Sequence, residues 1–308
     1  MDTETLYLPE DIIQEILSYL PVKTLLRFRC VSKSWYCLIG SNRFIKTHLL
    51  KSKTHLPRHE RWQNIFMSNS KNPNLLFKRC PHDDLIPIDD PINHHLIRGS
   101  KFVGHINGLV CIRNLPALFF LWNPATRISI QLTKPDCELE CIVKSGFGWD
   151  PQSDAYKVFA VLSKKKIRVS KIYSSKTNAW KTVEQHGSLD LVDVDGEFSN
   201  GRIHWLLRNG WIETFDLRSE VFGRIELPTK QMVGDHIWLK SWTQCDLCVV
   251  YYDSDKKMRE VWLILLELGE KQSWFELELD MRACLPYFKS KPCYCIESLM
   301  PPVSHKIT

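Results

Sequence analysis

Pairs of aromatic residues with a polar turn between them recur along the second half of the sequence, and the members of each pair stand seven positions apart. The pairs are Trp149 and Tyr156, Tyr173 and Trp180, and Phe215 and Phe222. Aromatic residues on both sides of a turn are typical of two antiparallel strands joined in a hairpin. Trp180 and Phe222 are 42 residues apart, and Phe222 and Trp274 are 52 apart. Trp274 belongs to a weaker copy, in which Glu267 stands where the first aromatic residue would be. Such intervals predict a β-propeller with four-stranded blades, in which the aromatic pairs pack mostly between blades.

The composition fits a folded chain with more than one domain. The chain has 308 residues, of which 44% are hydrophobic and 25% charged, enough to build a packed core. Lys and Arg number 41 against 35 Asp and Glu, and this mild, scattered excess gives no argument for nucleic-acid binding. The strongly apolar runs, such as Val261–Leu266, are far shorter than the roughly 20 residues that cross a bilayer, so we expect no membrane partner.

The cysteines and the N-terminus indicate the compartment. Met1–Thr5 is acidic where a signal peptide would be basic, and no apolar segment follows it. The 11 cysteines are an odd number and are scattered along the chain. This pattern favours reduced thiols, so we expect the protein in the cytoplasm, the nucleus or both.

The sequence changes character after about residue 50. Before that point apolar residues recur at helical spacing, whereas from residue 101 onward runs rich in β-branched and aromatic residues alternate with turn residues. The stretch between is irregular, with strands expected near Ile65–Met67 and Leu75–Phe77. We therefore expect an α+β multidomain chain: three or four small helices over residues 1–50, a linker with the first strands over 51–100, and an all-β, propeller-like domain over 101–308.

The N-terminal helices offer more apolar side chains than a small helical core can hide. Pro9 suits the first position of a helix that continues to Pro21, and shorter helices follow, the last over Arg43–Leu50. About forty residues in short helices bury little apolar surface by themselves. The surplus either packs on the rest of this chain or forms an exposed patch for a partner, and the residues alone leave both interpretations open.

The same residues resemble an F-box. The resemblance covers about residues 5–48 and includes the Leu8-Pro9 opening and the Val-Ser-Lys-x-Trp signature of Val31–Trp35. It implies docking onto a Skp-type adaptor, which binds a cullin scaffold. The adaptor interface that the resemblance implies consists of Leu8, Pro9, Ile13, Leu17, Leu20, Pro21, Leu25, Val31 and Trp35. We expect Ile12, Ile16 and Phe28 to fill the helical core instead.

Residues of about 100–285 look like the plant F-box-associated interaction domain, which is kelch-like. The matching segments are Gly104–Cys111, Leu121–Arg127, Phe147–Asp150, Asp154–Val158, Asn200–Trp205, Phe215–Leu217, Val261–Ile264 and Ser273-Trp274. Together with the F-box, they point to the large plant family that includes the S-locus F-box proteins. Family members usually continue for further strands beyond the Ser-Trp segment. We therefore expect one of three outcomes: a propeller that is incomplete at its C-terminus, a propeller whose final residues pair with the first strands, or a shortened member of the family.

No motif for chemistry stands out in the sequence. It has no phosphate-binding Gly-x-x-x-x-Gly-Lys, no Gly-x-Ser-x-Gly and no His-Glu-x-x-His. Cys80, His82, His94 and His95 do not have the spacing of a zinc site, and Cys245 and Cys248 lead into an apolar strand that favours buried thiols. The pairs Cys137 with Cys141 and Cys293 with Cys295 give no better pattern. We expect no catalytic residue, no cofactor and no metal.

We therefore expect a non-catalytic substrate-recognition subunit of a Skp-cullin-F-box ubiquitin ligase, whose β domain binds an unidentified target protein. The alternatives are a ligase-independent binding propeller, which reads glycans or nucleic acid or acts as a Skp-bound scaffold, and a propeller enzyme with a polar central channel. Exposed tryptophans beside basic groups would favour the binding propeller. Target contacts are expected on loops at one end of the propeller: Lys134–Glu140, Gln185–Asp195, Asn209-Gly210 and Thr229–Asp235. The acidic stretch Asp190–Glu197 and the basic Lys164–Lys166 are expected to be solvated surface.

Overall fold

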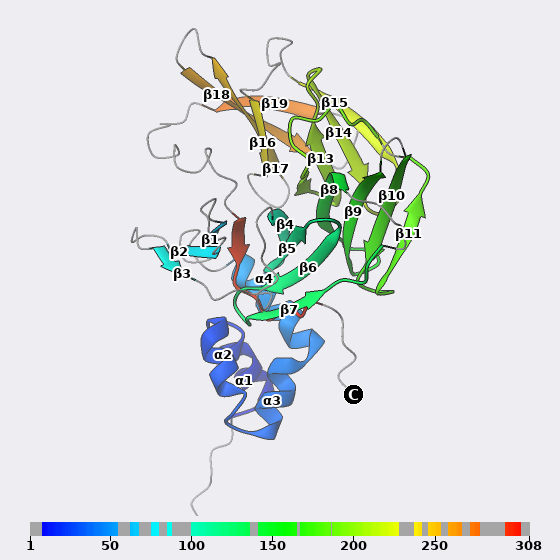
Figure 1. The fold of residues 1–308 in the computed structure, drawn as a ribbon. Coiled ribbons are helices and arrows are strands. Elements are labelled where there is room, and N and C mark those ends of the chain that lie inside the picture. Colours follow the sequence, from blue (N-terminus) through cyan, green and yellow to red (C-terminus); the bar gives the residue numbers. More distant parts are fainter. Residues whose placement is uncertain are drawn as a thin grey trace, which may run out of the picture.

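The computed structural model confirms a helical N-terminal unit followed by an all-β, propeller-like domain (Figure 1). It describes residues 8–54, 62–67, 75–79, 85–87, 100–135, 141–164, 167–185, 187–227, 237–241, 246–253, 258–266, 272–277 and 293–302. Within these residues the chain forms four α-helices and five four-stranded antiparallel sheets.

The helices are packed around one small core. They are α1 (Glu10–Leu17), α2 (Val22–Phe28), α3 (Lys33–Gly40) and α4 (Asn42–Thr54). Short connections keep neighbouring helices in contact, because each has one apolar stripe to bury. The buried members of this helical core are Leu17, Val22, Leu25, Ile39, Phe44, Ile45 and, from the far end of the chain, Leu299.

The sheets follow one another along the chain. The first sheet contains β1 (Trp62–Met67), β2 (Leu75–Arg79), β3 (Leu85–Pro87) and β20 (Cys293–Ile296). The second and third contain β4 (Lys101–Ile106), β5 (Leu109–Asn114), β6 (Leu118–Asn123) and β7 (Ile128–Gln131), and then β8 (Cys141–Asp150), β9 (Ala155–Lys164), β10 (Ile167–Ser174) and β11 (Ala179–Val183). The fourth and fifth contain β12 (Glu197–Ser199), β13 (Arg202–Leu206), β14 (Trp211–Asp216) and β15 (Phe222–Glu226), and then β16 (Ile237–Ser241), β17 (Asp246–Asp253), β18 (Met258–Leu266) and β19 (Gln272–Leu277).

The C-terminal strand completes the first sheet. β20 pairs antiparallel with β1, so that Trp62 stands opposite Ile296 and Ile65 opposite Cys293. Neighbouring sheets meet mainly through their first strands, with β4 beside β8 and β12 beside both β8 and β16, and β20 occupies the matching position beside β4. The pairing of the final residues with the first strands, which is one of the outcomes expected for the C-terminus, is therefore observed.

The aromatic pairs of the repeat stand opposite each other across hairpins and then pack on the next sheet. Tyr173 faces Trp180, and the two rings are 5.5 Å apart between centroids. Trp180 also lies 5.4 Å from the ring of Phe119 in the second sheet. Phe215 faces Phe222 in the same way, and Phe159 of the third sheet lies 4.5 Å from Phe215. The predicted packing of the pairs between blades is confirmed at these positions.

Side chains that follow the aromatic residues hold the turns. Asn123 and Asp216 each accept hydrogen bonds from two backbone N–H groups of their turns, and Asp150 accepts one from Gln152 N and one from the Ser153 hydroxyl. Burial raises the pKa of the Asp150 carboxyl, but the hydrogen bonds from Ser153, Lys157 and Gln152 outweigh it and hold the pKa below its ordinary value. This explains why an Asn or Asp recurs after the first aromatic residue of the repeat.

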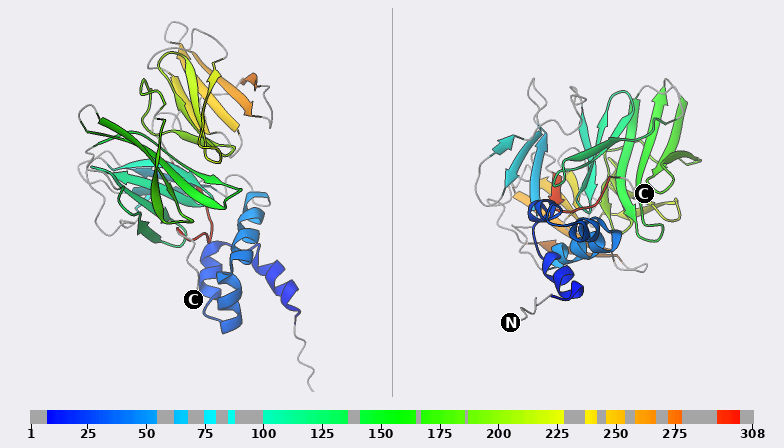
Figure 2. Two further views of the ribbon diagram at one scale, coloured as in Figure 1. Left: turned by 90° about the vertical axis from the view of Figure 1, so that its right-hand side faces the viewer. Right: turned by 90° about the horizontal axis from the view of Figure 1, so that it is seen from below.

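The antiparallel order gives the propeller two distinct ends. Turns between the first and second and between the third and fourth strands of each sheet lie at one end, and the other connections lie at the opposite end. The helical unit lies at the first of these ends, here called the helix end (Figure 2). There the Lys53 ammonium donates to the side-chain oxygen of Asn107 (2.7 Å), and Lys46 pairs with Asp154 (2.5 Å). The opposite end is called the far end.

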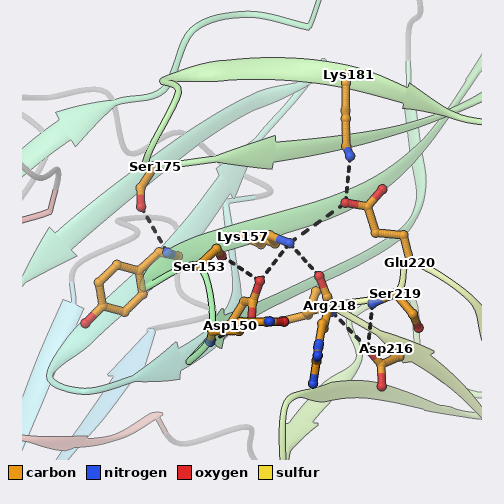
Figure 3. A network of polar contacts seen from close by, with 12 residues as sticks. Asp150, Ser153, Lys157, Ser175, Lys181, Asp216, Arg218, Ser219 and Glu220 are labelled. Carbon is orange, nitrogen blue, oxygen red and sulfur yellow. Dashed lines mark hydrogen bonds and ion pairs between the residues drawn. The ribbon is translucent and has the colours of Figure 1, made fainter.

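A polar network ties two turns together at the helix end (Figure 3). The Lys157 ammonium lies 3.1 Å from Asp150 of its own sheet and donates to the Leu217 carbonyl of the fourth sheet (2.5 Å). Glu220 of that sheet pairs with Lys181 (2.8 Å) of the third. The third and fourth sheets are thus joined by charge-assisted contacts as well as by aromatic packing.

Candidate interaction surfaces

An apolar stripe that begins just before α1 and continues along it faces solvent. Leu8, Ile12 and Ile16 are four residues apart and are 60%, 47% and 52% exposed. Four further large side chains of the helical unit are about half exposed or more: Tyr19, Val31, Tyr36 and Leu50. Monomeric proteins rarely gather so many large apolar side chains on one small unit unless a partner covers them.

Helix α1 carries two apolar stripes, and the inner one fills the helical core. Leu17 is 2% exposed, and Ile13 and Leu20 pack against the same core. The core is therefore satisfied without Ile12 and Ile16, and the prediction that these two residues fill it is wrong. Phe28 does pack against the core, with its ring 5.4 Å from that of Trp35.

The nine residues predicted to contact an adaptor differ in exposure. Leu8, Pro9, Pro21 and Val31 are exposed. Ile13, Leu20 and Trp35 are partly buried against the helical core. Leu17 and Leu25 are 2% and 0% exposed, because they form the centre of this core. Their contact with an adaptor stays a prediction. Four further exposed side chains were not assigned to the adaptor interface, namely Ile12, Ile16, Tyr19 and Tyr36, although the four-residue spacing of Leu8, Ile12 and Ile16 was visible in the sequence.

The signature residues also have a local structural role. α1 begins at Glu10, so Pro9 is its N-cap, one position earlier than predicted, and the Pro9 carbonyl accepts from Ile12 N (3.0 Å). The Ser32 hydroxyl accepts from Trp35 N (3.2 Å) and caps α3. These caps fix where the helices start and hence which side chains face outward.

Two of the loops predicted to contact a target lie at the far end. The segment 187–195 leads from the third sheet into the fourth, and Asn209-Gly210 joins β13 to β14. Lys134 is exposed, but its neighbour Thr133 donates to the carbonyl of Asn178 (3.4 Å), in the β10–β11 turn at the helix end. Residues 136–140, 165–166, 186 and 228–236 lie outside the described residues. The far end is thus free of the helical unit, while target contact there stays a prediction.

Two buried ion pairs hold the segment 187–195. Arg113 donates two hydrogen bonds to Asp195 (2.8 and 3.0 Å), and Ser145 donates a third. Lys144 pairs with Glu213, and Glu213 accepts from Ser188 N (2.9 Å). The expectation that Asp190–Glu197 is solvated surface is therefore wrong for Asp195, which is 5% exposed, whereas Asp190 and Asp193 are exposed.

A smaller polar group lies on the inner strands of the propeller. Glu197 of β12 accepts from the Ser241 hydroxyl (3.4 Å) and lies 3.7 Å from the Lys240 ammonium, both on β16. Burial lowers the pKa of His105 on β4 to about 4, and Glu197 and Lys240 act on it in opposite directions. The His105 imidazole is therefore neutral near pH 7. The polar group thus combines this neutral ring with the ion pair of Glu197 and Lys240.

The tryptophan side chains that the structure describes are buried or partly buried. Trp122 and Trp205 are 1% exposed. The remaining tryptophans with described side chains are partly buried, namely Trp35, Trp149, Trp180, Trp211, Trp238, Trp262 and Trp274. A stacking platform for bases or sugars needs exposed aromatic faces, so the described tryptophans give it no support.

Among the described residues, no three His, Cys, Asp or Glu side chains are grouped to hold a metal ion. Cys80, His82, His94, His95, Cys137 and Cys245 lie outside the described part of the chain. Burial raises the pKa of the Cys248 thiol to about 12, which fits the predicted buried thiol. No helix in the described residues has the length and apolar character of a membrane span.

Comparison with known proteins places these features in a family. Residues 6–47 match the F-box domain, and residues 87–301 match the F-box associated beta propeller domain. An F-box/kelch-repeat protein of Arabidopsis thaliana is 29% identical over 88% of this chain and 78% of its own length. The F-box protein CPR1 of the same plant is 28% identical over 87% of this chain and 71% of its own. A putative F-box protein, 25% identical over 76% of this chain, is matched over 64% of its own length. The chain therefore belongs to the family of plant F-box proteins that carry an F-box associated β-propeller domain.

Proposed function

We propose that this protein is a substrate-recognition subunit of a Skp-cullin-F-box ubiquitin ligase. The helical unit docks on a Skp-type adaptor, which links the chain indirectly to a cullin, and the β domain binds a target protein. The chain contributes no bond-making chemistry, because tethering alone raises the effective concentration of the target lysines near the ubiquitin-charged enzyme. The proposed site of action is the cytoplasm or the nucleus.

The observation that carries this proposal is the exposed stripe of Leu8, Ile12 and Ile16. Its side chains lie outside a helical core that is already filled, so they remain available to a partner. Fully burying a side chain of this size contributes about 1.5–3 kcal/mol, so covering the exposed half of each isoleucine contributes about 1 kcal/mol.

The proposal is tested by capturing a plant Skp-type adaptor with the purified full chain and measuring its Kd. The variant Ile12→Asp with Ile16→Asp places two carboxylates where the adaptor must exclude water. Lost apolar burial and uncompensated charge together weaken binding by more than about 100-fold, which corresponds to about 2.8 kcal/mol. Both positions are about half exposed, so the helices fold unchanged.

The matched control is Ile128→Asp with Val221→Asp. These residues are 50% and 55% exposed on the β domain, so the chemical change and the exposure are the same but the location differs. The control should bind the adaptor as the wild type does. If the wild type captures no adaptor, or if both double variants weaken capture equally, the proposed docking face is wrong.

Target binding is proposed for the far end of the propeller. The helical unit occupies the helix end, and buried ion pairs hold the segment 187–195 at the far end in one conformation. A preorganised loop loses little conformational entropy when it binds. Exchanging exposed residues such as Asp190, Asp193 and Asn209 for alanine should reduce capture of target proteins while adaptor binding is unchanged. A chain that captures the adaptor but no cullin would instead be the Skp-bound scaffold of the alternative.

A further inference from the structure

The C-terminal segment, residues 297–302, contacts both domains at once. It follows β20, the strand that completes the first sheet. Leu299 is 7% exposed and is a member of the helical core, together with Leu17, Leu25 and Phe44. A residue nearly three hundred positions from α1 therefore completes the core of the N-terminal helices.

Hydrogen bonds fix the C-terminal segment to the second sheet. The Ser298 hydroxyl donates to the Asn107 carbonyl (2.7 Å). The Asn123 side-chain amide donates to the carbonyls of Ser298 (2.9 Å) and Met300 (2.8 Å). Ser298 and Asn123 are both 0% exposed, so in the folded chain these hydrogen bonds lie in the interior, where water is not an alternative partner.

The neighbouring turn is shaped to receive the segment. Gly108 has φ of +83°, and a Cβ atom at this position would stand 2.2 Å from the Ser298 hydroxyl oxygen and 2.7 Å from the Ile296 carbonyl oxygen. Glycine therefore serves both the left-handed backbone and the close approach of the segment. Asn107, in the same turn, also accepts from Lys53 of α4, so one turn contacts the segment and the helices.

The other described contacts between the helical unit and the propeller contribute less to holding the two domains together. The ion pair of Lys46 with Asp154 has side chains that are 56% and 50% exposed, and exposed pairs of this kind contribute little. Ala125 packs against the helical core, but its side chain is a single methyl group. The buried leucine of the C-terminal segment offers much more apolar contact than either.

We propose that the C-terminal segment is a clamp that sets the orientation of the F-box relative to the propeller. Leu299 and Ser298 are its positioning residues: one anchors the segment in the helical core and the other anchors it on the second sheet. Because β20 belongs to the first sheet, the orientation is tied to completion of that sheet. For ubiquitin transfer, the clamp would hold a target at one fixed place relative to the adaptor, and this consequence rests on the proposed function. The clamp itself does not depend on that function, because it is argued from the contacts of the C-terminal segment.

The test measures the distance between the two domains in the full chain bound to a plant Skp-type adaptor. Donor and acceptor dyes are attached through noncanonical amino acids at Arg43 on α4 and Arg168 on β10, both exposed and both outside the proposed adaptor interface. One truncation ends the chain after Glu297, and its matched control ends it after Pro302, which keeps every contact described above. Single-molecule energy transfer then reports the distribution of distances.

We expect one narrow distribution for the wild type and the control, and a broad one for the chain that ends at Glu297. Leu299→Ala keeps the backbone hydrogen bonds of the segment and should broaden the distribution of distances in part. This variant replaces the truncation in the test if the truncated chain does not fold. Adaptor capture is measured in parallel, because a purely structural defect would reduce capture without widening the distribution of the bound chains.

A narrow, wild-type distribution for Leu299→Ala and for a folded truncation would overturn the clamp. Failure of the wild type to capture the adaptor would contradict the proposed function instead. In that event the same distances measured on the free chain still decide whether the clamp exists.

Discussion

Replacing Glu213 by glutamine should destabilise the β domain strongly, because it leaves the Lys144 ammonium buried without its counter-charge. The side chains of Lys144 and Glu213 are 0% and 3% exposed. Burial lowers the pKa of Lys144, and Glu213 opposes this shift through its hydrogen bond and its charge. Removing one member of a buried pair costs about 3–5 kcal/mol, a large part of the stability of an ordinary domain.

The double variant Lys144→Met with Glu213→Gln tests whether the cost comes from the charge. Methionine occupies much of the lysine volume beside Trp205 and Phe222, whose ring centroids lie 4.3 and 4.9 Å from the ammonium. The glutamine oxygen can still accept from Ser188 N. Because no charge remains buried, the double variant should lie within about 1 kcal/mol of the wild type.

The assay is urea unfolding followed by tryptophan fluorescence, with the two single variants and the double variant forming a thermodynamic cycle. Hydrogen exchange at Ser188 N reports whether the segment 187–195 loosens before the domain unfolds. The reasoning is refuted if Glu213→Gln alone is as stable as the wild type, or if the double variant is as unstable as Glu213→Gln.

Two further predictions concern the caps and the buried histidines. Ser32→Ala removes the hydroxyl that accepts from Trp35 N and should lower the free energy of unfolding of the helical unit by about 1 kcal/mol, measured by denaturation, whereas Ser34→Ala should change it less. Burial lowers the pKa of both His105 and His204 to about 4 from 6.5, so the unfolded chain takes up protons first as the pH falls. The contribution of these neutral histidines to the free energy of unfolding is therefore fully present above pH 6.5 and is lost toward pH 4. At pH 5.5 each histidine lowers the free energy of unfolding by about 1.4 kcal/mol. Unfolding measured across this range should show a shallower pH dependence for His204→Gln, and an unchanged dependence would count against neutral burial of that ring.

The outer parts of the fold were predictable because they rest on local patterns. Two aromatic residues seven positions apart identify a hairpin whenever the residues between them form a turn, as Tyr173 and Trp180 illustrate. The N-terminal helices were predicted in the same way, from apolar residues at helical spacing. The division of α1 into an inner and an outer stripe did not follow, since Ile12 and Ile16 fit helical spacing as well as Ile13 and Leu17 do. Which stripe is covered depends on the packing of α2, α3 and α4.

The buried charges and the C-terminal contacts were not predictable, because each depends on residues distant in the chain. Asp195 belongs to an acidic stretch that reads as solvated surface, and its partner Arg113 is 82 positions away. Leu299 follows a short strand and has no periodic neighbours that would mark it as part of a helical core. Pairing of β20 with β1 joins the two ends of the β domain. The free sheet edges made this pairing one of the expected outcomes, but no local pattern identifies the residues that pair.

The position of the helices at one end of the propeller makes the sheets a spacer of fixed thickness. β9 has 10 residues and, at about 3.3 Å per residue, is about 30 Å long, whereas β13 has 5 residues and is about half that length. A protein bound at the far end is therefore separated from whatever covers α1 by the length of these strands. Lengthening or shortening the hairpins would alter the reach of the assembly without altering either binding surface.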